Sequence, residues 1–297
     1  MLCLIKFAHL SILYIFSLET SLNNLTKRIL TALWGIPLIL FLTYKGSIYF
    51  LILLLIINGI SLYEYYLLHE KMNIFPFKAT GVFFSSVILL IVYFFPLDFL
   101  YIGFLIMVAA FLLWHLRLSK TIASVNTSIT LSGMLYITLF LSALILLRQH
   151  FDAWVGVEKD QNVGGIYFQF FWISIWVSDI FAYSGGHLLG KHKLAPHTSP
   201  NKTIEGAFFG FIGPLIIFLG ITPFFLPQLP LRHLIISALI VGIIGKIGDL
   251  VESKFKRDAV VKDTSTILLG HGGFLDRFDS LIFVSPFLYL YFYFTRL

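Results

Sequence analysis

The sequence predicts an all-α membrane protein, a polytopic transmembrane helix bundle with little mass outside the bilayer. Of its 297 residues, 58% are hydrophobic and only 12% are charged, whereas about a quarter of the residues of a soluble globular domain carry a charge. The mean hydropathy is +0.91, and 32 residues are Phe. A helix needs roughly 20 apolar residues to cross the hydrocarbon core, and apolar runs of this kind recur along the whole chain.

About nine transmembrane spans are predicted, separated by short breaks that contain charge, Pro or Gly. The apolar runs begin near Ile29, Ser47, Gly81, Leu100, Leu131, Ile166, Ala207, Leu234 and Leu281. Before them, residues 2–18 are apolar but contain Lys6 and His9 and lack a clear small-residue cleavage site. We therefore expect an N-terminal extension over residues 1–24 with an extra hydrophobic or interfacial helix. Residues 25–165 then form the N-terminal spans, and residues 166–297 form a C-terminal transmembrane region with the catalytic groups.

The distribution of basic residues predicts the orientation, because Lys and Arg accumulate in cytoplasmic loops. One alternating set of loops holds fourteen Lys and Arg residues and the other holds five. This places the segment before Ile29 and the loops 184–204 and 249–279 in the cytoplasm. The net charge of +6 then reflects loops beside anionic lipid, and we expect no nucleic-acid binding. The single cysteine, Cys3, excludes a metal site built of Cys, so carboxylates, His or substrate phosphates must hold any metal.

The densest cluster of charge lies between Lys246 and Asp279, where twelve of the chain's 36 charged residues fall within 34 positions. Charge runs are usually solvated surface, but the helical spacing here favours a functional site. At about 100° per residue, one helix face collects four polar side chains: Asp249, Glu252, Ser253 and Lys256. Because this helix continues an apolar span, its polar face is expected to open into the bundle.

Two further features around the last span favour a functional site. Asp276 and Asp279 lie three residues apart on one helix face with Ser280. A carboxylate at the centre of a transmembrane helix costs about 2.5 to 3.5 kcal/mol, so a functional role is the default hypothesis. The glycine-rich segment 270–273 directly precedes this helix, and glycines there let backbone N–H groups approach a phosphate.

A second polar segment runs from Asp179 to Glu205. Asp179 interrupts an apolar run, so we expect it to face the bundle interior, with a structural hydrogen bond to a neighbouring helix as the alternative. Residues 199–206 are predicted as a loop leading into a helix, with Thr203 or Ser199 as the cap and Lys202 placed to meet a phosphate. Three histidines at spacings of five do not form a compact zinc motif and are interpreted as interfacial: His187, His192 and His197.

Several motifs in these two segments resemble the signature of phosphatidate cytidylyltransferases (CDP-diacylglycerol synthases). The main match comprises Ser253-Lys-Phe-Lys-Arg257, Lys262-Asp263-Thr-Ser265 and His271-Gly-Gly-Phe-Leu-Asp276-Arg277-Phe-Asp279. Two upstream pieces are also similar: Gly248-Asp249-Leu250-Val-Glu252-Ser253 and Ser199-Pro200-Asn-Lys202-Thr203-Ile-Glu205-Gly206. Leu269 stands where the family usually has Pro, and Asn201 replaces a frequent Lys. The resemblance extends loosely from about Leu25, and residues 1–22 lie outside it.

The resemblance implies an enzyme of phospholipid biosynthesis that joins CTP to phosphatidic acid with Mg²⁺, giving CDP-diacylglycerol and pyrophosphate. On this basis the metal ligands are Asp249, Asp276 and Asp279. The catalytic groups are Lys202, Lys256, Arg257, Lys262, His271 and Arg277. The substrate-binding residues are Ser199, Thr203, Glu205, Ser253, Asp263, Gly272 and Gly273. We expect the enzyme in the inner (plasma) membrane of a bacterium, surrounded by membrane lipids, with its active site facing the cytoplasm, and as a homodimer.

Three other classes of protein agree less well with the sequence. A transporter or channel also buries charge, but it places charges near the bilayer midplane and shows related halves, whereas here the charges cluster at one face without a repeat. A lipid transferase that consumes CDP-diacylglycerol would carry an Asp-Gly-x-x-Ala-Arg type run, which the sequence lacks. A purely structural membrane protein would gain nothing from twelve clustered charges.

Overall fold

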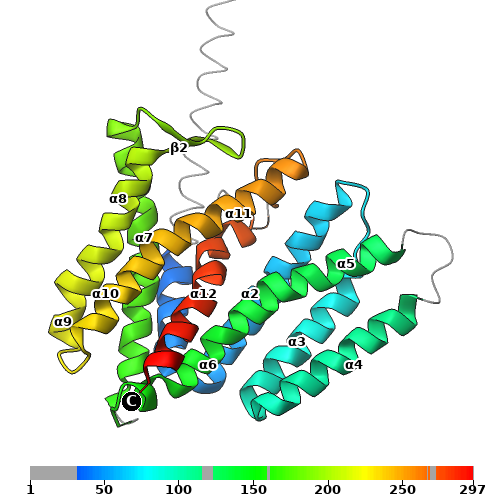
Figure 1. Ribbon diagram of the computed structural model, residues 1–297, viewed down its shortest axis with the longest axis horizontal. Helices are drawn as coiled ribbons and strands as arrows, with labels where there is room; N and C mark the ends of the chain where they lie inside the picture. Colours follow the sequence, from blue (N-terminus) through cyan, green and yellow to red (C-terminus); the bar gives the residue numbers. More distant parts are fainter. Residues whose placement is uncertain (1–31, 116–122, 159–160, 266, 268–271, 297) are drawn as a thin grey trace, which may run out of the picture.

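The predicted class is confirmed: the computed structural model is a bundle of helices with one short hairpin (Figure 1). It describes residues 32–115, 123–158, 161–265, 267 and 272–296. The extension expected over residues 1–24, the start of the first span at Ile29, and His271 lie outside the described residues.

The described helices follow the nine predicted apolar runs in order. The first five segments are Ala32–Lys45, α2 (Ser47–Glu70), α3 (Lys78–Phe94), α4 (Leu97–His115), and α5 (Ala123–Gly133) continued by the π-helix η1 (Met134–Thr138) and α6 (Leu139–Trp154). The next four are α7 (Val163–Leu189), α8 (Ile204–Leu215) continued by η3 (Ile216–Ile221) and α9 (Thr222–Phe225), α10 (Leu231–Leu239) continued by η4 (Ile240–Ile244) and α11 (Gly245–Asp258), and α12 (Leu275–Thr295).

Six of these segments are long and apolar enough to cross a membrane. They are Ser47–Glu70, Ser124–Trp154, Val163–Leu189, Ile204–Phe225, Leu231–Asp258 and Leu275–Thr295. Three shorter apolar helices accompany them: Ala32–Lys45, Lys78–Phe94 and Tyr101–Ala110. The protein is therefore an integral membrane protein by these criteria, and the count of nine spans stays a prediction.

Aromatic side chains fill the centre of the bundle, where α6, α7 and α12 meet. Phe151 of α6 stacks on Tyr167 of α7 with ring centroids 4.4 Å apart, and Phe292 of α12 lies 4.8 Å from Phe151. All three side chains are buried. Lipid tails are as apolar as these rings, so helix association within the bilayer depends on such close packing. Large apolar side chains such as Phe83, 63% exposed, cover the outer surface, as helices that face lipid require.

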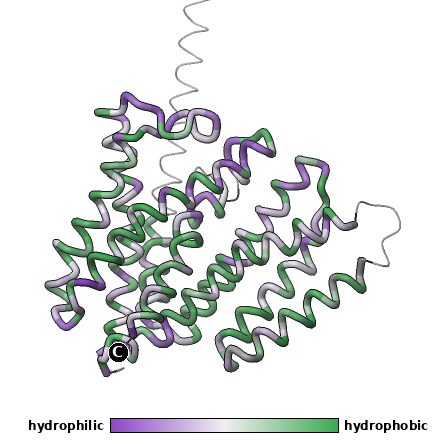
Figure 2. The backbone as a smooth tube through the Cα atoms, viewed as in Figure 1, coloured by the Kyte–Doolittle hydropathy of each residue, from purple (hydrophilic) through white to green (hydrophobic). Residues whose placement is uncertain are grey.

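The hairpin and the outer end of α11 are the longest hydrophilic stretches at one end of the bundle, and shorter hydrophilic turns lie at the opposite end (Figure 2). The hairpin joins α7 to α8 and consists of antiparallel strands β1 (Lys193–Ala195) and β2 (Ser199–Thr203). The loop predicted over residues 199–206 is thus a strand followed directly by α8. Thr203 caps that helix, because its hydroxyl accepts a hydrogen bond from the Gly206 N–H at 3.1 Å. This confirms one of the two predicted caps.

The two predicted cytoplasmic loops are shorter than the sequence pattern suggested. α7 continues to Leu189, α11 continues to Asp258, and α12 begins at Leu275. The helices therefore extend beyond their apolar stretches and carry their charged residues on regular helical faces. The predicted site is built largely on helices, which hold side chains more rigidly than loops do.

Candidate active site

Gly248 lets α11 approach α12 closely and so places their carboxylates side by side. The Ser280 hydroxyl on α12 donates a hydrogen bond to the Gly245 carbonyl on α11 at 3.1 Å. A Cβ atom on Gly248 would lie 3.1 Å from the backbone oxygen of Asp279. Small residues allow such close helix approach in membranes. Asp249, next to Gly248, consequently faces Asp279 across the helix crossing.

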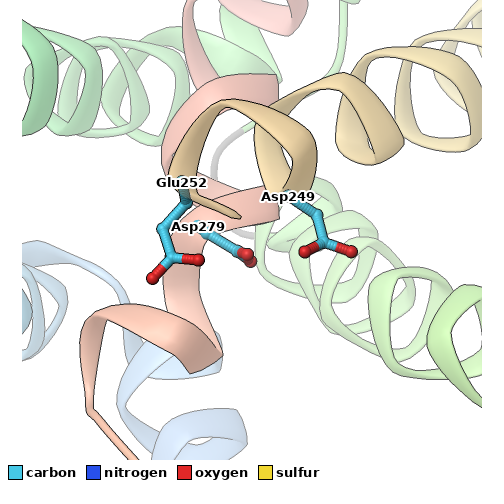
Figure 3. Close-up of side chains that lie close together, drawn as sticks. All are labelled: Asp249, Glu252 and Asp279. Atoms are coloured by element: carbon cyan, nitrogen blue, oxygen red, sulfur yellow. The ribbon is translucent and has the colours of Figure 1, made fainter. Parts of the chain in front are cut away.

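Three carboxylates meet at this crossing: Asp249 and Glu252 of α11 and Asp279 of α12 (Figure 3). Each offers one oxygen, and these atoms all lie within 4.8 Å of one another. Glu252 is fully buried, and its Oε1 has no hydrogen-bond partner among the residues that the structure describes. Like charges this close repel each other, and Mg²⁺ prefers oxygen ligands of this kind. The three residues therefore fit a divalent cation.

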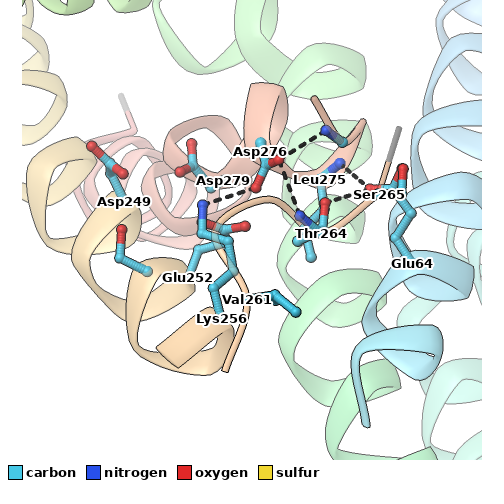
Figure 4. A network of polar contacts seen from close by, with 12 residues as sticks. Glu64, Asp249, Glu252, Lys256, Val261, Thr264, Ser265, Leu275, Asp276 and Asp279 are labelled. Atoms are coloured by element: carbon cyan, nitrogen blue, oxygen red, sulfur yellow. Dashed lines mark hydrogen bonds and ion pairs between the residues drawn. The ribbon is translucent and has the colours of Figure 1, made fainter. Parts of the chain in front are cut away.

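Asp276, the remaining predicted metal ligand, lies beside this cluster and makes other contacts (Figure 4). Its Oδ1 accepts a hydrogen bond from the Lys256 ammonium at 2.8 Å. Its Oδ2 accepts from the backbone N–H groups of Gly273 at 2.8 Å and Thr264 at 3.2 Å. Lys256 also forms an ion pair with Glu252. The structure thus joins Asp276 to the cluster through Lys256, and its predicted role as a direct ligand stays a prediction.

Glu252 takes the third place in the cluster, where the resemblance had placed Asp276. The sequence does place Glu252 on the same helix face as Asp249, but that pattern alone does not distinguish a metal ligand from a neighbouring polar residue. Only the packing of α11 on α12 shows that Glu252 points to Asp279.

A cavity of about 630 Å³ opens beside the carboxylates. This volume lies within the roughly 300–1,000 Å³ typical of small-molecule sites. The charged and polar residues of its lining come from α7, the hairpin, α11 and α12: Asp179, His187, Ser199, Asn201, Lys202, Thr203, Lys246, Asp249, Asp276, Arg277, Asp279 and Ser280. The cavity thus combines cationic side chains with carboxylates, as a site for a phosphate and a metal ion must.

Two lysines of the cavity wall form ion pairs with carboxylates. Lys202 of β2 lies 2.5 Å from Asp249 and also donates to the buried Ser253 hydroxyl at 3.3 Å. Lys246 lies 2.8 Å from Asp179. The Asp179 side chain is 58% exposed and lines the cavity, so the prediction that it faces the bundle interior is wrong, whereas the alternative, a hydrogen bond to a neighbouring helix, is confirmed by Lys246. The reason is the ion pair between Asp179 and Lys246. The continuous segment of α10, η4 and α11 places Lys246 opposite α7.

Two other predicted site residues hold the hairpin in place. Arg257 donates hydrogen bonds to the backbone carbonyls of Thr198 and Val261, at 3.0 and 2.9 Å. Glu205 lies 2.6 Å from the ring nitrogen Nδ1 of His192. These contacts connect the hairpin with α11 and α8, and they position Lys202 over the cluster.

The remaining predicted residues are located as follows. Lys262 and Asp263 are exposed in the segment after α11, Arg277 is exposed on the cavity wall, and Gly272 and Gly273 precede α12. Gly272 has φ of +80°, a conformation that glycine adopts at little cost. The roles assigned to these residues stay predictions.

One buried residue near the site was not indicated by the sequence motifs. Glu64 of α2 accepts hydrogen bonds from the segment that leads into α12 (Figure 4). The signal that could have found it is the cost of an acid within an apolar helix, since Glu64 follows the long apolar run of α2.

Comparison with known proteins gives a consistent result. Residues 26–295 match the Cytidylyltransferase family. The chain is 34% identical over 273 residues to the phosphatidate cytidylyltransferase of Bacillus subtilis (strain 168), an alignment that covers 90% of this chain and 97% of that protein. It is 45% identical over 141 residues to the phosphatidate cytidylyltransferase of Staphylococcus saprophyticus, covering 46% of this chain and 54% of that protein. All the residues that line the cavity lie within the matched range.

Proposed function

The chain belongs to the cytidylyltransferase family, and from this premise we propose that it joins CTP to phosphatidic acid at the cavity beside α11 and α12. The products are CDP-diacylglycerol and pyrophosphate. The observation that carries the proposal is the cluster of Asp249, Glu252 and Asp279 at the wall of a cavity that also presents Lys202 and Lys246.

The reaction brings together two anions, and this determines what the site must do. A phosphate oxygen of phosphatidic acid forms a bond to the α-phosphorus of CTP, and the bond from that phosphorus to the oxygen bridging to the β-phosphate breaks. The bridging oxygen leaves with pyrophosphate. The nucleophile is already an anion, so no general base is needed. Positioned positive charge is needed, because electrostatic stabilisation is the main contribution to this class of transfer.

Basic residues of the cavity supply part of this charge. Lys202, Lys246 and Arg277 line it and bind the phosphates of the two substrates. Lys202 and Lys246 form ion pairs with carboxylates of the same wall. A substrate phosphate therefore replaces a carboxylate as the anionic partner of each lysine. Lys256 lies deeper, between Glu252 and Asp276, and offsets the charge of the cluster.

The cluster of Asp249, Glu252 and Asp279 would hold Mg²⁺. When bound there, the ion would supply positive charge that neutralises the phosphates. The support for this assignment is the separation of the three oxygens and the buried Oε1 of Glu252, which has no hydrogen-bond partner among the described residues.

The protein lies in the inner membrane of a bacterium, and its active site faces the cytoplasm. The support is the excess of Lys and Arg in the alternating set of loops that includes residues 184–204, fourteen against five in the sequence, and the bacterial origin of the relatives. In this orientation CTP enters from the cytoplasm and phosphatidic acid from the membrane. The homodimer stays a prediction, which the mass of the purified protein in detergent tests.

Substrate replacement tests the proposed reaction. Purified protein is incubated with Mg²⁺ and labelled CTP or labelled ATP, and with phosphatidic acid or diacylglycerol, which lacks the attacking phosphate. We expect a labelled lipid only from CTP with phosphatidic acid, accompanied by pyrophosphate. Equal use of ATP, or a labelled product from diacylglycerol, would contradict the proposal.

A further inference from the structure

Glu64 is a fully buried carboxylate on α2 whose two oxygens accept four hydrogen bonds, and Figure 4 shows it beside Thr264, Ser265 and Leu275. Oε2 accepts from the Thr264 hydroxyl at 2.9 Å and from the Leu275 N–H at 2.7 Å. Oε1 accepts from the Ser265 hydroxyl at 2.5 Å and from the Phe274 N–H at 2.8 Å. A carboxylate has about four lone-pair sites, so these donors use all of them.

The two backbone donors belong to the start of α12. Phe274 is the N-cap and Leu275 the first residue of this helix, and the first N–H groups of a helix have no partner inside it. The helix N-terminus also carries a partial positive charge that favours an anion. Glu64 therefore caps α12 from a different helix, 210 residues earlier in the chain than Phe274.

The hydroxyl donors connect Glu64 with the site. Thr264, which donates its hydroxyl to Glu64, donates its backbone N–H to Asp276. Asp276 in turn holds Lys256, and Lys256 contacts Glu252 of the carboxylate cluster. One continuous chain of polar contacts thus runs from the C-terminal part of α2 to the proposed metal ligands.

We propose that Glu64 is a positioning residue for the cytidylyl transfer, an inference that rests on the proposed function. By fixing the start of α12 and the Thr264–Ser265 segment, it sets the direction of Asp276 and, through Asp276, of Lys256. No described residue that precedes Asp179 in the sequence lines the cavity. The N-terminal spans thus contribute to the reaction through Glu64, although Glu64 does not contact substrate.

The substitution Glu64→Gln distinguishes the positioning role from a role in packing alone. Gln has nearly the same shape, but its NH₂ group is a donor and turns one acceptor position into a donor. A hydroxyl can rotate to accept, whereas a backbone N–H of Phe274 or Leu275 cannot. We expect Glu64→Gln to lower kcat at least tenfold, with KM for CTP and phosphatidic acid changed by less than about twofold.

Two further variants discriminate between the explanations. Glu64→Asp is shorter but keeps a carboxylate, so it should retain more kcat than Glu64→Gln, whereas a role in packing alone predicts the opposite order. Glu70→Gln is the matched control on α2, since the partly buried Glu70 forms an ion pair with Lys78, with side chains 27% and 28% exposed, and has no contact with the α12 segment among the described residues. We expect wild-type kcat for Glu70→Gln.

A measurement independent of turnover keeps this inference distinct from the proposed reaction. Hydrogen exchange at the Phe274 and Leu275 amides should speed up in Glu64→Gln and stay at the wild-type rate in Glu70→Gln. If wild-type protein makes no CDP-diacylglycerol, the proposed function fails while the exchange result still reports the cap. If wild-type protein is active and Glu64→Gln keeps its kcat, or loses activity only in proportion to its folded fraction, the positioning role is wrong.

If Glu64→Gln does not fold, a milder substitution tests the same positioning role. Thr264→Val removes one of the four donors and preserves the shape of the side chain. Because one hydrogen bond of this kind contributes modestly, we expect kcat to fall about three- to tenfold with KM unchanged. Wild-type kcat in folded Thr264→Val would overturn the proposal.

Discussion

Replacing Asp249 by Asn, beside a matched replacement of Asp258, tests the carboxylate cluster on a single helix. Both residues lie on α11. Asp249 borders the cavity, and its oxygen lies within 4.8 Å of those of Glu252 and Asp279. Asp258 instead pairs with Lys254 on the exposed side of the helix. We expect Asp249→Asn to abolish turnover and Asp258→Asn to retain most of it.

The size of the difference follows from these surroundings. Removing one electrostatic group from a preorganised site costs about 3 to 4 kcal/mol, and each 1.36 kcal/mol is a factor of ten in rate. Asp249→Asn should therefore lose on the order of 10³-fold in kcat. The Lys254–Asp258 pair has side chains 61% and 45% exposed, and such i,i+4 pairs contribute about 0.3 to 0.5 kcal/mol to stability. Asp258→Asn should change the rate by roughly twofold at most.

We expect Asp276→Asn to abolish turnover as Asp249→Asn does. The Asp276 carboxylate accepts hydrogen bonds from Lys256 and from two backbone N–H groups. The assay is turnover of CTP by the three variants at matched expression, with size-exclusion profiles in detergent as the check on folding. If Asp258→Asn were as inactive as Asp276→Asn, or if either Asp249→Asn or Asp276→Asn stayed active, the reasoning about this site would be refuted.

Three other outcomes are expected. Glu252→Gln should raise the Mg²⁺ concentration for half-maximal rate at least tenfold in a titration of activity, and an unchanged requirement would remove Glu252 from the metal site. Gly248→Ala should lower both Tm and kcat, because its Cβ would lie 3.1 Å from a backbone oxygen of α12, whereas Gly220→Ala, with no atom within 4 Å, should leave both unchanged; equal effects would mean that the close crossing of α11 and α12 is unimportant. In a variant without Cys3, a cysteine at Val260, a position 91% exposed, should react with an impermeant thiol reagent only from the cytoplasmic side of the membrane, and reaction only from the outside of sealed cells would reverse the topology.

The sequence predicted the helical class and much of the site because both depend on local spacing. The face shared by Asp249 and Lys256 follows from helical periodicity on α11, and the cap at Thr203 follows from a residue preference at helix starts. Most apolar runs begin within about three residues of the helix that they predict, but the runs at Leu131 and Leu281 begin well inside helices that start at Ala123 and Leu275. These features do not require knowledge of which helices are neighbours.

The features that the sequence did not predict depend on contacts between distant segments. Glu252 and Asp276 are both acids near the helix crossing, and only the packing of α11 on α12 places one in the cluster and the other on Lys256. Glu64 acts on residues some 200 positions later. The hairpin was missed because its strands are short and polar, and cross-strand and tertiary contacts such as that of Glu205 with His192 hold them in place.

Cytidylyl transfer by wild-type protein and by Asp279→Asn, measured side by side with and without a divalent cation, tests both the proposed reaction and the role of the carboxylate cluster. Asp279 is buried, contributes to the carboxylate cluster and lines the cavity. We expect wild-type protein to release one pyrophosphate for each CDP-diacylglycerol formed, only when Mg²⁺ is present, and folded Asp279→Asn to form neither product. Turnover that persists undiminished in excess chelator, or in Asp279→Asn, would contradict this expectation.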